Sequence, residues 1–149
     1  MTHRTSKTQQ GFVQDYLAYL LARASHEISA EFHEQVLASG LSVMQWRVLA
    51  SLSDSPPLSI GALADIVLAQ QPTATKLVTR MVQDGLIKRL PHPQDKRSVL
   101  VTLTALGRRK ATPLLHKARA HEAQVLARLP GTDTAALKDM LRRWIEHSL

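Results

Sequence analysis

The sequence LAQQPTATKLVTRMVQDGLIKRLPHPQDKRSVLVTLT, residues 68–104, decides the fold. Pro72 stands where a first helical residue has no partner for its N–H, and apolar residues recur at helical spacing from there to Gly85, a typical stop. Two runs of alternating apolar residues follow, over 86–90 and 98–103, and the turn between them contains two prolines. The stretch therefore predicts a short helix followed by a β-hairpin with a rigid tip.

The positive charge of the chain is concentrated in the same region. Residues 70–110 hold nine Lys and Arg side chains against two acids, Asp84 and Asp95, a difference of +7. The whole chain has 19 basic and 12 acidic side chains, so the ten of each that remain elsewhere cancel. A charge excess confined to one helix and one hairpin is typical of a surface that contacts phosphates. It predicts the DNA-contacting face of a winged helix-turn-helix.

A long helical pattern precedes this region. From Phe12 to Leu37 apolar residues recur every four positions, which predicts one helix of about 26 residues before Gly40. Such a helix is long for a small domain, so we expect part of its apolar face to pack against a second copy of the chain. Two shorter helices are expected over 43–52 and 60–67, because a serine suited to N-capping precedes each of them.

Two further helices are expected after the hairpin. Thr104 is a suitable N-cap for a helix over 105–129, in which Pro113 predicts a kink. A last helix is expected from 133 to about 147. The order of elements predicts a mainly α protein with a small β-hairpin wing. Its expected parts are a winged helix-turn-helix lobe at 42–104 and a helical dimerisation region formed by 10–40 and 105–149.

The first helix and the last two helices carry apolar stripes that a small lobe cannot cover alone. We therefore expect these stripes to meet in a homodimer, although they could instead close a bundle within one chain. The candidates for the dimer core are Phe12, Val13, Leu17, Val125, Leu129, Leu137, Leu141, Trp144 and Ile145.

Composition restricts the class of protein. The 149 residues are 44% hydrophobic and 21% charged, which is ordinary for a globular chain, and only 4% aromatic, which argues against base stacking on single strands. The absence of cysteine excludes disulfides, thiolate zinc sites and thiol redox sensing. No apolar run approaches the ~20 residues of a membrane span, and the polar residues 1–10 lack the apolar core of a secretory signal. We therefore expect a cytoplasmic protein with no membrane contact.

Residues 75–107 resemble a known family. The run TKLVTRMVQDGLIKR, 75–89, is similar to the recognition helix and first wing strand of the MarR family of bacterial transcription regulators. The run DKRSVLVTLT, 95–104, with Gly107, resembles the wing signature of that family and the start of its long helix. The order of elements resembles the family over nearly the whole chain. The resemblance implies a homodimer, a palindromic operator in double-stranded DNA and, often, relief of repression by a small ligand.

The helix and hairpin supply the candidate DNA-binding residues. A recognition helix presents its first turns to base edges in the major groove, where Arg80 could read a guanine or clamp a phosphate. Arg97, on a rigid tip, suits the narrow and electronegative minor groove. The resemblance implies that Asp95 holds this arginine by a charge-assisted bond. The candidates are Gln71, Thr73, Thr75, Lys76, Thr79, Arg80, Lys88, Arg89, His92, Asp95, Lys96 and Arg97.

A ligand site is expected from the resemblance rather than from the residues. In the resembled family, effectors lie between the dimerisation helices and the DNA-binding lobe, and many are aromatic acids. An arginine could pair with a carboxylate while aromatic side chains enclose a ring. The alternative is that these side chains are ordinary surface and core residues. The candidates are Tyr16, Tyr19, Arg23, His26, Trp46 and Arg47.

Three other functions compete with this one. A metal-responsive regulator of the same fold would need two helices to bring His26, His33, Glu34, His116, His121 and Glu122 around zinc, but neither histidine pair has a spacing of three or four. A non-specific architectural DNA binder would share the charge. An enzyme is disfavoured, because the chain has no cysteine nucleophile, no Gly-x-Ser-x-Gly elbow and no phosphate-binding glycine loop. We therefore expect no catalytic residue, no cofactor and no bound metal.

Overall fold

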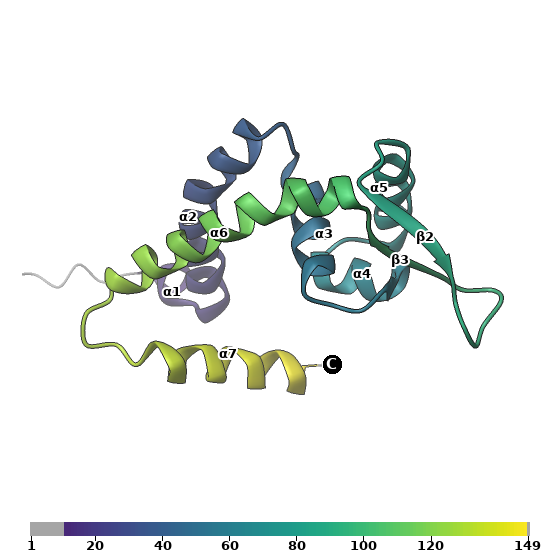
Figure 1. The fold of residues 1–149 in the computed structure, drawn as a ribbon. Helices are drawn as coiled ribbons and strands as arrows, with labels where there is room; N and C mark the ends of the chain where they lie inside the picture. The colour runs from purple at the N-terminus through teal and green to yellow at the C-terminus, as the bar shows by residue number, and fades with distance from the viewer. Residues whose placement is uncertain (1–10, 149) are drawn as a thin grey trace, which may run out of the picture.

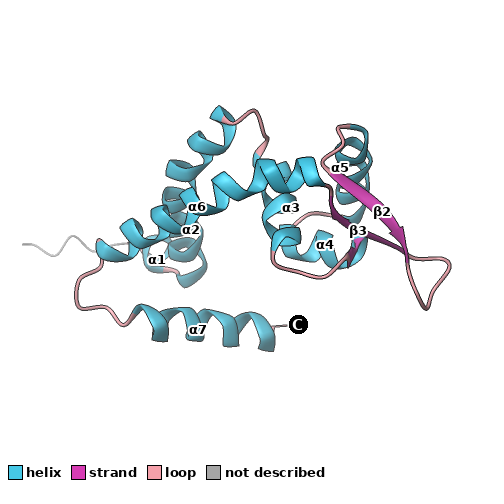
Figure 2. Ribbon diagram, viewed as in Figure 1, coloured by secondary structure: helices cyan, strands magenta, loops and turns pink. Residues whose placement is uncertain are grey.

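The computed structural model describes residues 11–148 and shows a mainly helical chain with one small antiparallel sheet (Figures 1 and 2). In chain order the elements are α1 (Phe12–Asp15), α2 (Leu17–Ala38), α3 (Val43–Ser53), β1 (Leu58–Ser59), α4 (Ile60–Val67), α5 (Gln71–Gln83), β2 (Ile87–Pro91), β3 (Val99–Leu103), α6 (Ala105–Ala127) and α7 (Thr134–His147). The predicted fold class is confirmed. The polar start of the chain, residues 1–10, lies outside the described residues.

The single long helix predicted from Phe12 to Leu37 is wrong. Tyr16 has extended backbone angles, φ −70° and ψ 124°, and separates the four-residue α1 from α2. The rings of Phe12 and Tyr16 lie 5.5 Å apart across this break. So short a helix has few internal hydrogen bonds to lose, and the break leaves the four-residue spacing of apolar residues unchanged. The periodic pattern therefore could not reveal it.

Side chains predicted to cap the helices do so. Ser42 Oγ accepts a hydrogen bond from the Gln45 backbone N–H at 3.1 Å, and Gln45 Oε1 accepts one from the Ser42 N–H at 2.9 Å, a complete capping box for α3. The predicted caps Ser59 and Thr104 each accept one backbone N–H, from Ala62 in α4 and from Gly107 in α6. Asp133, which was not predicted as a cap, accepts the N–H of Ala136 in α7. Helix α6 continues through Pro113 and ends two residues earlier than predicted.

The sheet has strand order β1-β3-β2, with both pairs antiparallel. The predicted hairpin is β2 and β3, in which Ile87 pairs with Leu103 and Pro91 pairs with Val99. Strand β1 was not predicted, because two residues are too few to show an alternating pattern. It joins the segment before α4 to the middle of β3, and it thereby ties the hairpin to the helices.

The hydrophobic core lies between α3, α4, α5, the sheet and the neighbouring parts of α2 and α6. Leu49 of α3, Leu63 of α4 and Met81 of α5 are completely buried in it. Phe32 of α2 and Trp46 of α3 meet edge to face, with ring centroids 5.4 Å apart. This core holds α5 and the hairpin in a fixed relation to each other.

α1, the start of α2, the end of α6 and α7 form the opposite end of the molecule (Figure 1). This end exposes apolar side chains. Helix α7 buries no residue, and Lys138 joins it to Glu122 of α6 by an ion pair of 2.8 Å. Of the nine candidates for a dimer core, Val125 is buried, Leu137 and Leu141 are half-buried, and the other six are exposed. No helix within residues 11–148 is both long and apolar enough to cross a membrane.

Candidate functional site

One face of α5 is buried and the other is free. Ala74, Val78 and Met81 point into the core, as the three- to four-residue spacing of a helix requires. The six α5 residues predicted to contact DNA, Gln71, Thr73, Thr75, Lys76, Thr79 and Arg80, are all exposed. The core therefore turns the predicted face of α5 toward solvent.

Several polar groups on this face already have partners. The Thr75 hydroxyl donates to the Gln71 carbonyl oxygen at 2.9 Å, and the Thr79 hydroxyl donates to the Thr75 carbonyl oxygen at 3.0 Å. Arg89 of β2 donates to the Thr79 oxygen at 3.1 Å, which links the hairpin to α5. Arg80 Nε lies 3.5 Å from Asp84 Oδ1. Within residues 11–148, Lys76 has no such ion pair.

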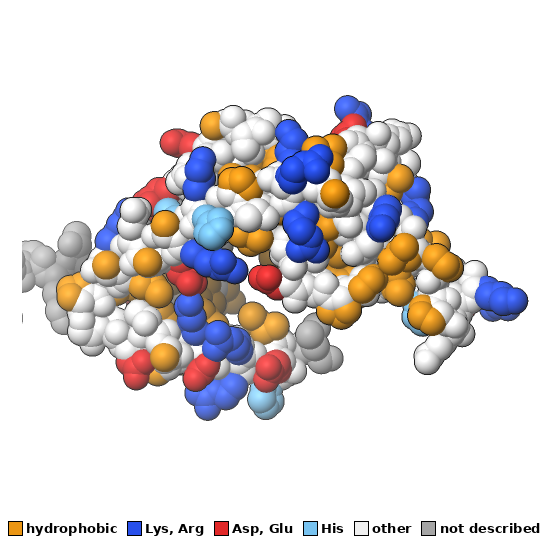
Figure 3. All heavy atoms as spheres, viewed as in Figure 1, with side chains coloured by type: hydrophobic (Ala, Val, Ile, Leu, Met, Phe, Trp, Pro, Cys, Tyr) orange, Lys and Arg blue, Asp and Glu red, His pale blue; other side chains and the backbone are white. Residues whose placement is uncertain are grey.

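The tip of the hairpin, residues 92–97, is held by bonds between neighbouring residues. His92 Nδ1 accepts the backbone N–H groups of Gln94 and Asp95, both at 3.1 Å. Asp95 Oδ1 accepts the backbone N–H of Arg97 at 2.9 Å. The side chains of Lys96 and Arg97 are exposed, and Figure 3 shows basic side-chain atoms at the far end of the hairpin. The tip therefore presents its cations on an ordered loop.

Two residues of the tip bond the loop backbone. Asp95 was expected to hold Arg97 by a charge-assisted bond, and its carboxylate accepts the backbone N–H of that residue instead. The ring of His92, expected to contact phosphate, is half-buried and accepts loop N–H groups through Nδ1, and its contact with phosphate stays a prediction. Asp95 shapes the loop because short polar side chains readily accept an N–H group two residues ahead.

The two cations of β2 do not lie on one face. Successive side chains of a strand point to opposite sides of the sheet, so Lys88 and Arg89 diverge. Arg89 reaches Thr79 on the side of α5, and Lys88, exposed as well, projects from the other side. The structure therefore brings Arg89 to the α5 face and separates Lys88 from it.

Two adjoining cavities lie where α2, α3 and α6 meet. The first, of about 280 Å³, is lined by Ala22, Ser25, His26, Ser29, Ala30, His33 and Arg47. The second, of about 260 Å³, is lined by Ile28, Ser29, Phe32, His33, Trp46, Arg47 and His121. Three residues, Ser29, His33 and Arg47, line both. These surfaces combine aromatic rings, hydroxyls and cationic groups, and no acidic side chain lines either cavity.

Arg47 and His33 determine the electrostatics of the cavities. The half-buried Arg47 donates to Met44 Sδ at 3.8 Å and has no ion pair among the residues that the structure describes. Burial, and then the positive charges of Arg47 and His26, lower the pKa of His33 below its ordinary value. The cavities therefore have an excess of positive charge.

The structure brings together half of the predicted ligand-binding residues. His26, Trp46 and Arg47 line the cavities. Tyr16, Tyr19 and Arg23 line neither of them, and Arg23 forms an exposed ion pair with Glu27 at 3.0 Å. Ser25, Ser29 and His33 also belong to this site and were not predicted. Their four-residue spacing places them on one face of α2, but it does not indicate which elements that face meets.

Of the histidines and acids considered for zinc, two have other side-chain partners: His121 bonds Glu31, and Glu122 pairs with Lys138 at 2.8 Å. Glu31 of α2 accepts two bonds from Arg128 at the end of α6, at 2.7 and 3.0 Å, and lies 3.2 Å from His121 Nε2. The bond from Arg128, and then that from His121, lower the pKa of Glu31. Within residues 11–148 no three His, Asp or Glu side chains are arranged to hold a metal ion. The cluster joins α2 to α6 beside the cavities.

A sequence model of the MarR family matches residues 41–99, which run from just before α3 through α5, β2 and the hairpin tip to the first residue of β3. The homoprotocatechuate degradative operon repressor of Escherichia coli is 32% identical over 119 residues, 77% of this chain and 80% of the relative. The transcriptional repressor IacR of Pseudomonas putida is 30% identical, and the match covers 71% of this chain and 64% of the length of IacR.

Solved structures share the whole arrangement. A MarR family transcriptional regulator from Silicibacter pomeroyi is 41% identical and superposes with a TM-score of 0.83 over 94% of this chain and 100% of its own. The transcriptional repressor CouR, bound to a 23-mer DNA duplex, is 26% identical, with a TM-score of 0.75 over 94% and 99% of the two chains. The protein with this sequence therefore belongs to the MarR family of transcriptional regulators.

Proposed function

We propose that the protein is a homodimeric repressor that binds a palindromic operator in double-stranded DNA and is released by a small aromatic anion, phenolic or carboxylate. Its family consists of DNA-binding regulators and not of enzymes. The observation that carries the proposal is the exposed cationic surface made by α5 and the hairpin on one rigid core. Because its partner is DNA, we expect the protein to act in the cytoplasm.

The DNA-binding lobe is residues 42–104. Helix α5 would lie in the major groove, with Thr75, Lys76 and Arg80 toward base edges and phosphates. The hairpin tip would enter the adjacent minor groove through Arg97. The exposure of both surfaces supports this docking, and so does the structure of the related CouR, which was solved with a DNA duplex.

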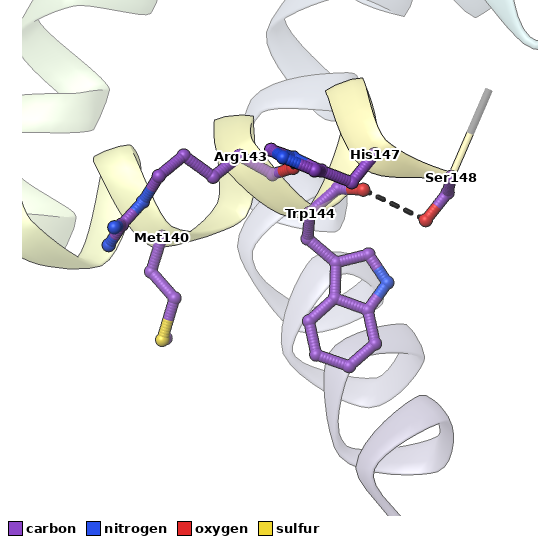
Figure 4. Close-up of a pocket in the computed structure, with 5 residues that line it drawn as sticks. All are labelled: Met140, Arg143, Trp144, His147 and Ser148. Carbon is purple, nitrogen blue, oxygen red and sulfur yellow. Dashed lines mark hydrogen bonds between the residues drawn. The ribbon is translucent and has the colours of Figure 1, made fainter.

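The dimerisation region is residues 10–40 and 105–149. Met140 and Trp144 extend from the same side of α7 beside an open groove (Figure 4), and Ile145 is 63% exposed. Apolar side chains gathered on unpacked helices favour burial against an identical surface on a second copy. A two-fold dimer would set two α5 helices about one turn of DNA apart, ~34 Å.

The effector would occupy the cavities between α2, α3 and α6. Arg47, without an acidic partner among residues 11–148, would bind a carboxylate, and Trp46 and Phe32 would border its ring. The relative from Escherichia coli represses a homoprotocatechuate degradative operon, and homoprotocatechuate is itself a phenolic carboxylate. An effector needs only ~1–3 kcal/mol of coupling to change DNA occupancy.

DNA binding is tested by gel-shift competition between the protein's own promoter region and random duplex at 50 and 200 mM salt. A specific regulator keeps its preference for the promoter at the higher salt, while non-specific binding collapses as counterions compete. Equal affinity for both duplexes at both salt concentrations would favour the architectural alternative.

The effector class is tested by adding homoprotocatechuate, phenylacetate and benzoate to the protein–promoter complex, with benzamide as the uncharged control. The aromatic anions are expected to release the DNA, and Arg47→Ala is expected to abolish the release while keeping DNA affinity. Release by benzamide, or release of the Arg47→Ala variant by the anions, would contradict an anion site at Arg47. A zinc titration on the same complex tests the metal-responsive alternative.

A further inference from the structure

The two cavities are lined by an arginine and three histidines and by no acidic side chain. His33 and Arg47 line both cavities, His26 lines the first and His121 lines the second. They come from three helices, α2, α3 and α6. No acidic side chain lines either cavity, so nothing on these walls offsets a proton added to His33.

The carboxylates nearest in sequence do not supply that balance. Glu31 accepts bonds from Arg128 and His121, and it is therefore engaged at the junction of α2 and α6. Glu27 is paired with Arg23. Glu34 follows His33 directly, but it is exposed and lines neither cavity. No carboxylate that lines these cavities therefore balances His33 and Arg47, and a bound anion would supply the missing charge.

We propose that His33 is an effector-binding residue that becomes protonated only when the anionic group of the effector enters beside Arg47. The protein then takes up a proton together with its ligand. This inference rests on the proposed effector function and adds to it a binding residue, a required ligand charge and a dependence on pH.

In the free protein His33 is held in its neutral form. Burial and the charges of Arg47 and His26 lower the pKa of His33, so the imidazole is neutral at pH 7. A carboxylate beside Arg47 cancels that repulsion and attracts the imidazolium, which raises the pKa of His33 in the complex. Between the two pKa values the complex holds one proton more than the free protein.

The sign of the pH dependence follows from this difference. As pH falls from the pKa of His33 in the complex toward its lower pKa in the free protein, each anion bound brings a proton, and affinity rises by up to roughly tenfold per pH unit. Below the lower pKa the dependence disappears, since His33 is then protonated in both states. A neutral ligand gains nothing from the proton, so the site prefers an anion over its uncharged analogue most strongly at acid pH.

The experiment is isothermal titration calorimetry of the full chain with homoprotocatechuate, phenylacetate and benzoate, across pH 6 to 8. At each pH, two buffers with different enthalpies of ionisation are used, because the difference in heat reports the protons taken up. The variants are His33→Gln and His26→Gln. His116→Gln is the matched control, because His116 is exposed on α6 and lines neither cavity. Thermal melting establishes that each variant is folded.

We expect wild type and His116→Gln to take up close to one proton with each anion within the pH window, and His33→Gln to bind with no uptake. Binding without uptake in wild type, or unchanged uptake in His33→Gln, would overturn this inference and leave the effector site in place. Loss of uptake in His26→Gln alone would assign the proton to His26 instead. If none of the anions binds at millimolar concentration, both the effector function and the inference are overturned.

Discussion

The loop that carries Arg97 is preorganised for DNA binding. The side chain of Arg97 is exposed, while its backbone N–H is bonded by Asp95 and the loop around it is ordered by His92. Little of the loop remains to be ordered on binding, which lowers the entropic cost of placing a guanidinium in a groove. Asp95 therefore acts on Arg97 through the backbone.

The first prediction is that Arg97→Ala weakens operator binding by roughly tenfold or more without unfolding the protein, because one buried cationic contact is lost from each half-site. Gel-shift titration with the promoter duplex measures it, and circular dichroism monitors the fold. Arg119→Ala, an exposed cation on α6, is the control and should leave affinity unchanged. Equal affinities for the wild type and the Arg97 variant would remove the hairpin tip from the interface.

The second prediction concerns Glu31, whose pKa is lowered first by the bond from Arg128 and then by His121. A carboxyl with a lower pKa in the folded state stabilises the fold above its ordinary value of 4.5, and this contribution is lost as pH falls through the folded pKa. Glu31→Gln should therefore lower the melting temperature at pH 7 and have less effect at pH 3.

Thermal melting from pH 7 to pH 3 measures this difference. Glu27→Gln is the control, because the Glu27 ion pair with Arg23 lies within one exposed helix and such pairs contribute little. The same loss for Glu31→Gln at pH 7 and pH 3 would show that the carboxylate charge is not what joins α2 to α6.

At the scale of elements, the start of α6 packs closely against the turn that joins α5 to β2. The Thr104 hydroxyl donates to the carbonyl oxygens of Gly85 at 2.6 Å and Leu86 at 3.1 Å, and it also caps the helix. Gly107 lies against the same Leu86 carbonyl, where a Cβ atom would overlap the oxygen. Glycine at 107 is therefore required by the close approach of α6 to the backbone of the turn before β2.

The third prediction is that Gly107→Ala destabilises the protein by about 3 kcal/mol or more, because the Leu86 backbone cannot move without losing its bonds to Thr104. Gly61→Ala, in α4, is the control. Its added methyl group would meet open space, so a gain of up to ~1 kcal/mol from higher helix propensity is expected. Urea denaturation measures both, and equal effects would contradict the close approach.

At the scale of the whole molecule, the two ends have opposite characters. One end has a continuous core beneath a cationic surface, and the other has helices α1 and α7 that bury no residue. The arrangement favours association through the apolar end, which leaves both cationic surfaces free for one DNA duplex.

The fourth prediction is that Ile145→Asp shifts the protein from dimer to monomer and raises the dimer dissociation constant at least ~tenfold. The substitution removes an apolar side chain that the proposed dimer would bury. Because the interface is two-fold, it also adds two charges there. Ile66→Asp is the control, since Ile66 is 53% exposed, comparable to the 63% of Ile145, but lies in α4, outside the proposed dimerisation region. Sedimentation equilibrium measures both. An unchanged dimer for Ile145→Asp, or equal dissociation of both variants, would contradict the proposed interface.

Local sequence patterns were sufficient to predict most of the helices, three of the helix caps and the hairpin. Ser42, Ser59 and Thr104 act on residues within three positions of themselves, and the alternation of the strands is equally local. The cationic face of α5 was predictable for the same reason, because burying one side of a helix exposes the other.

Four features could be found only in the tertiary structure: the break at Tyr16, the strand β1, the bond from the Arg97 backbone N–H to Asp95, and the cavity around His33. Periodicity records which side of an element is apolar, but it does not record which elements meet. His33 belongs to a binding site because α2 passes beside Arg47 of α3 and His121 of α6, residues distant in sequence. The contacts between these three helices depend on how the whole chain packs, so a local sequence pattern could not predict them.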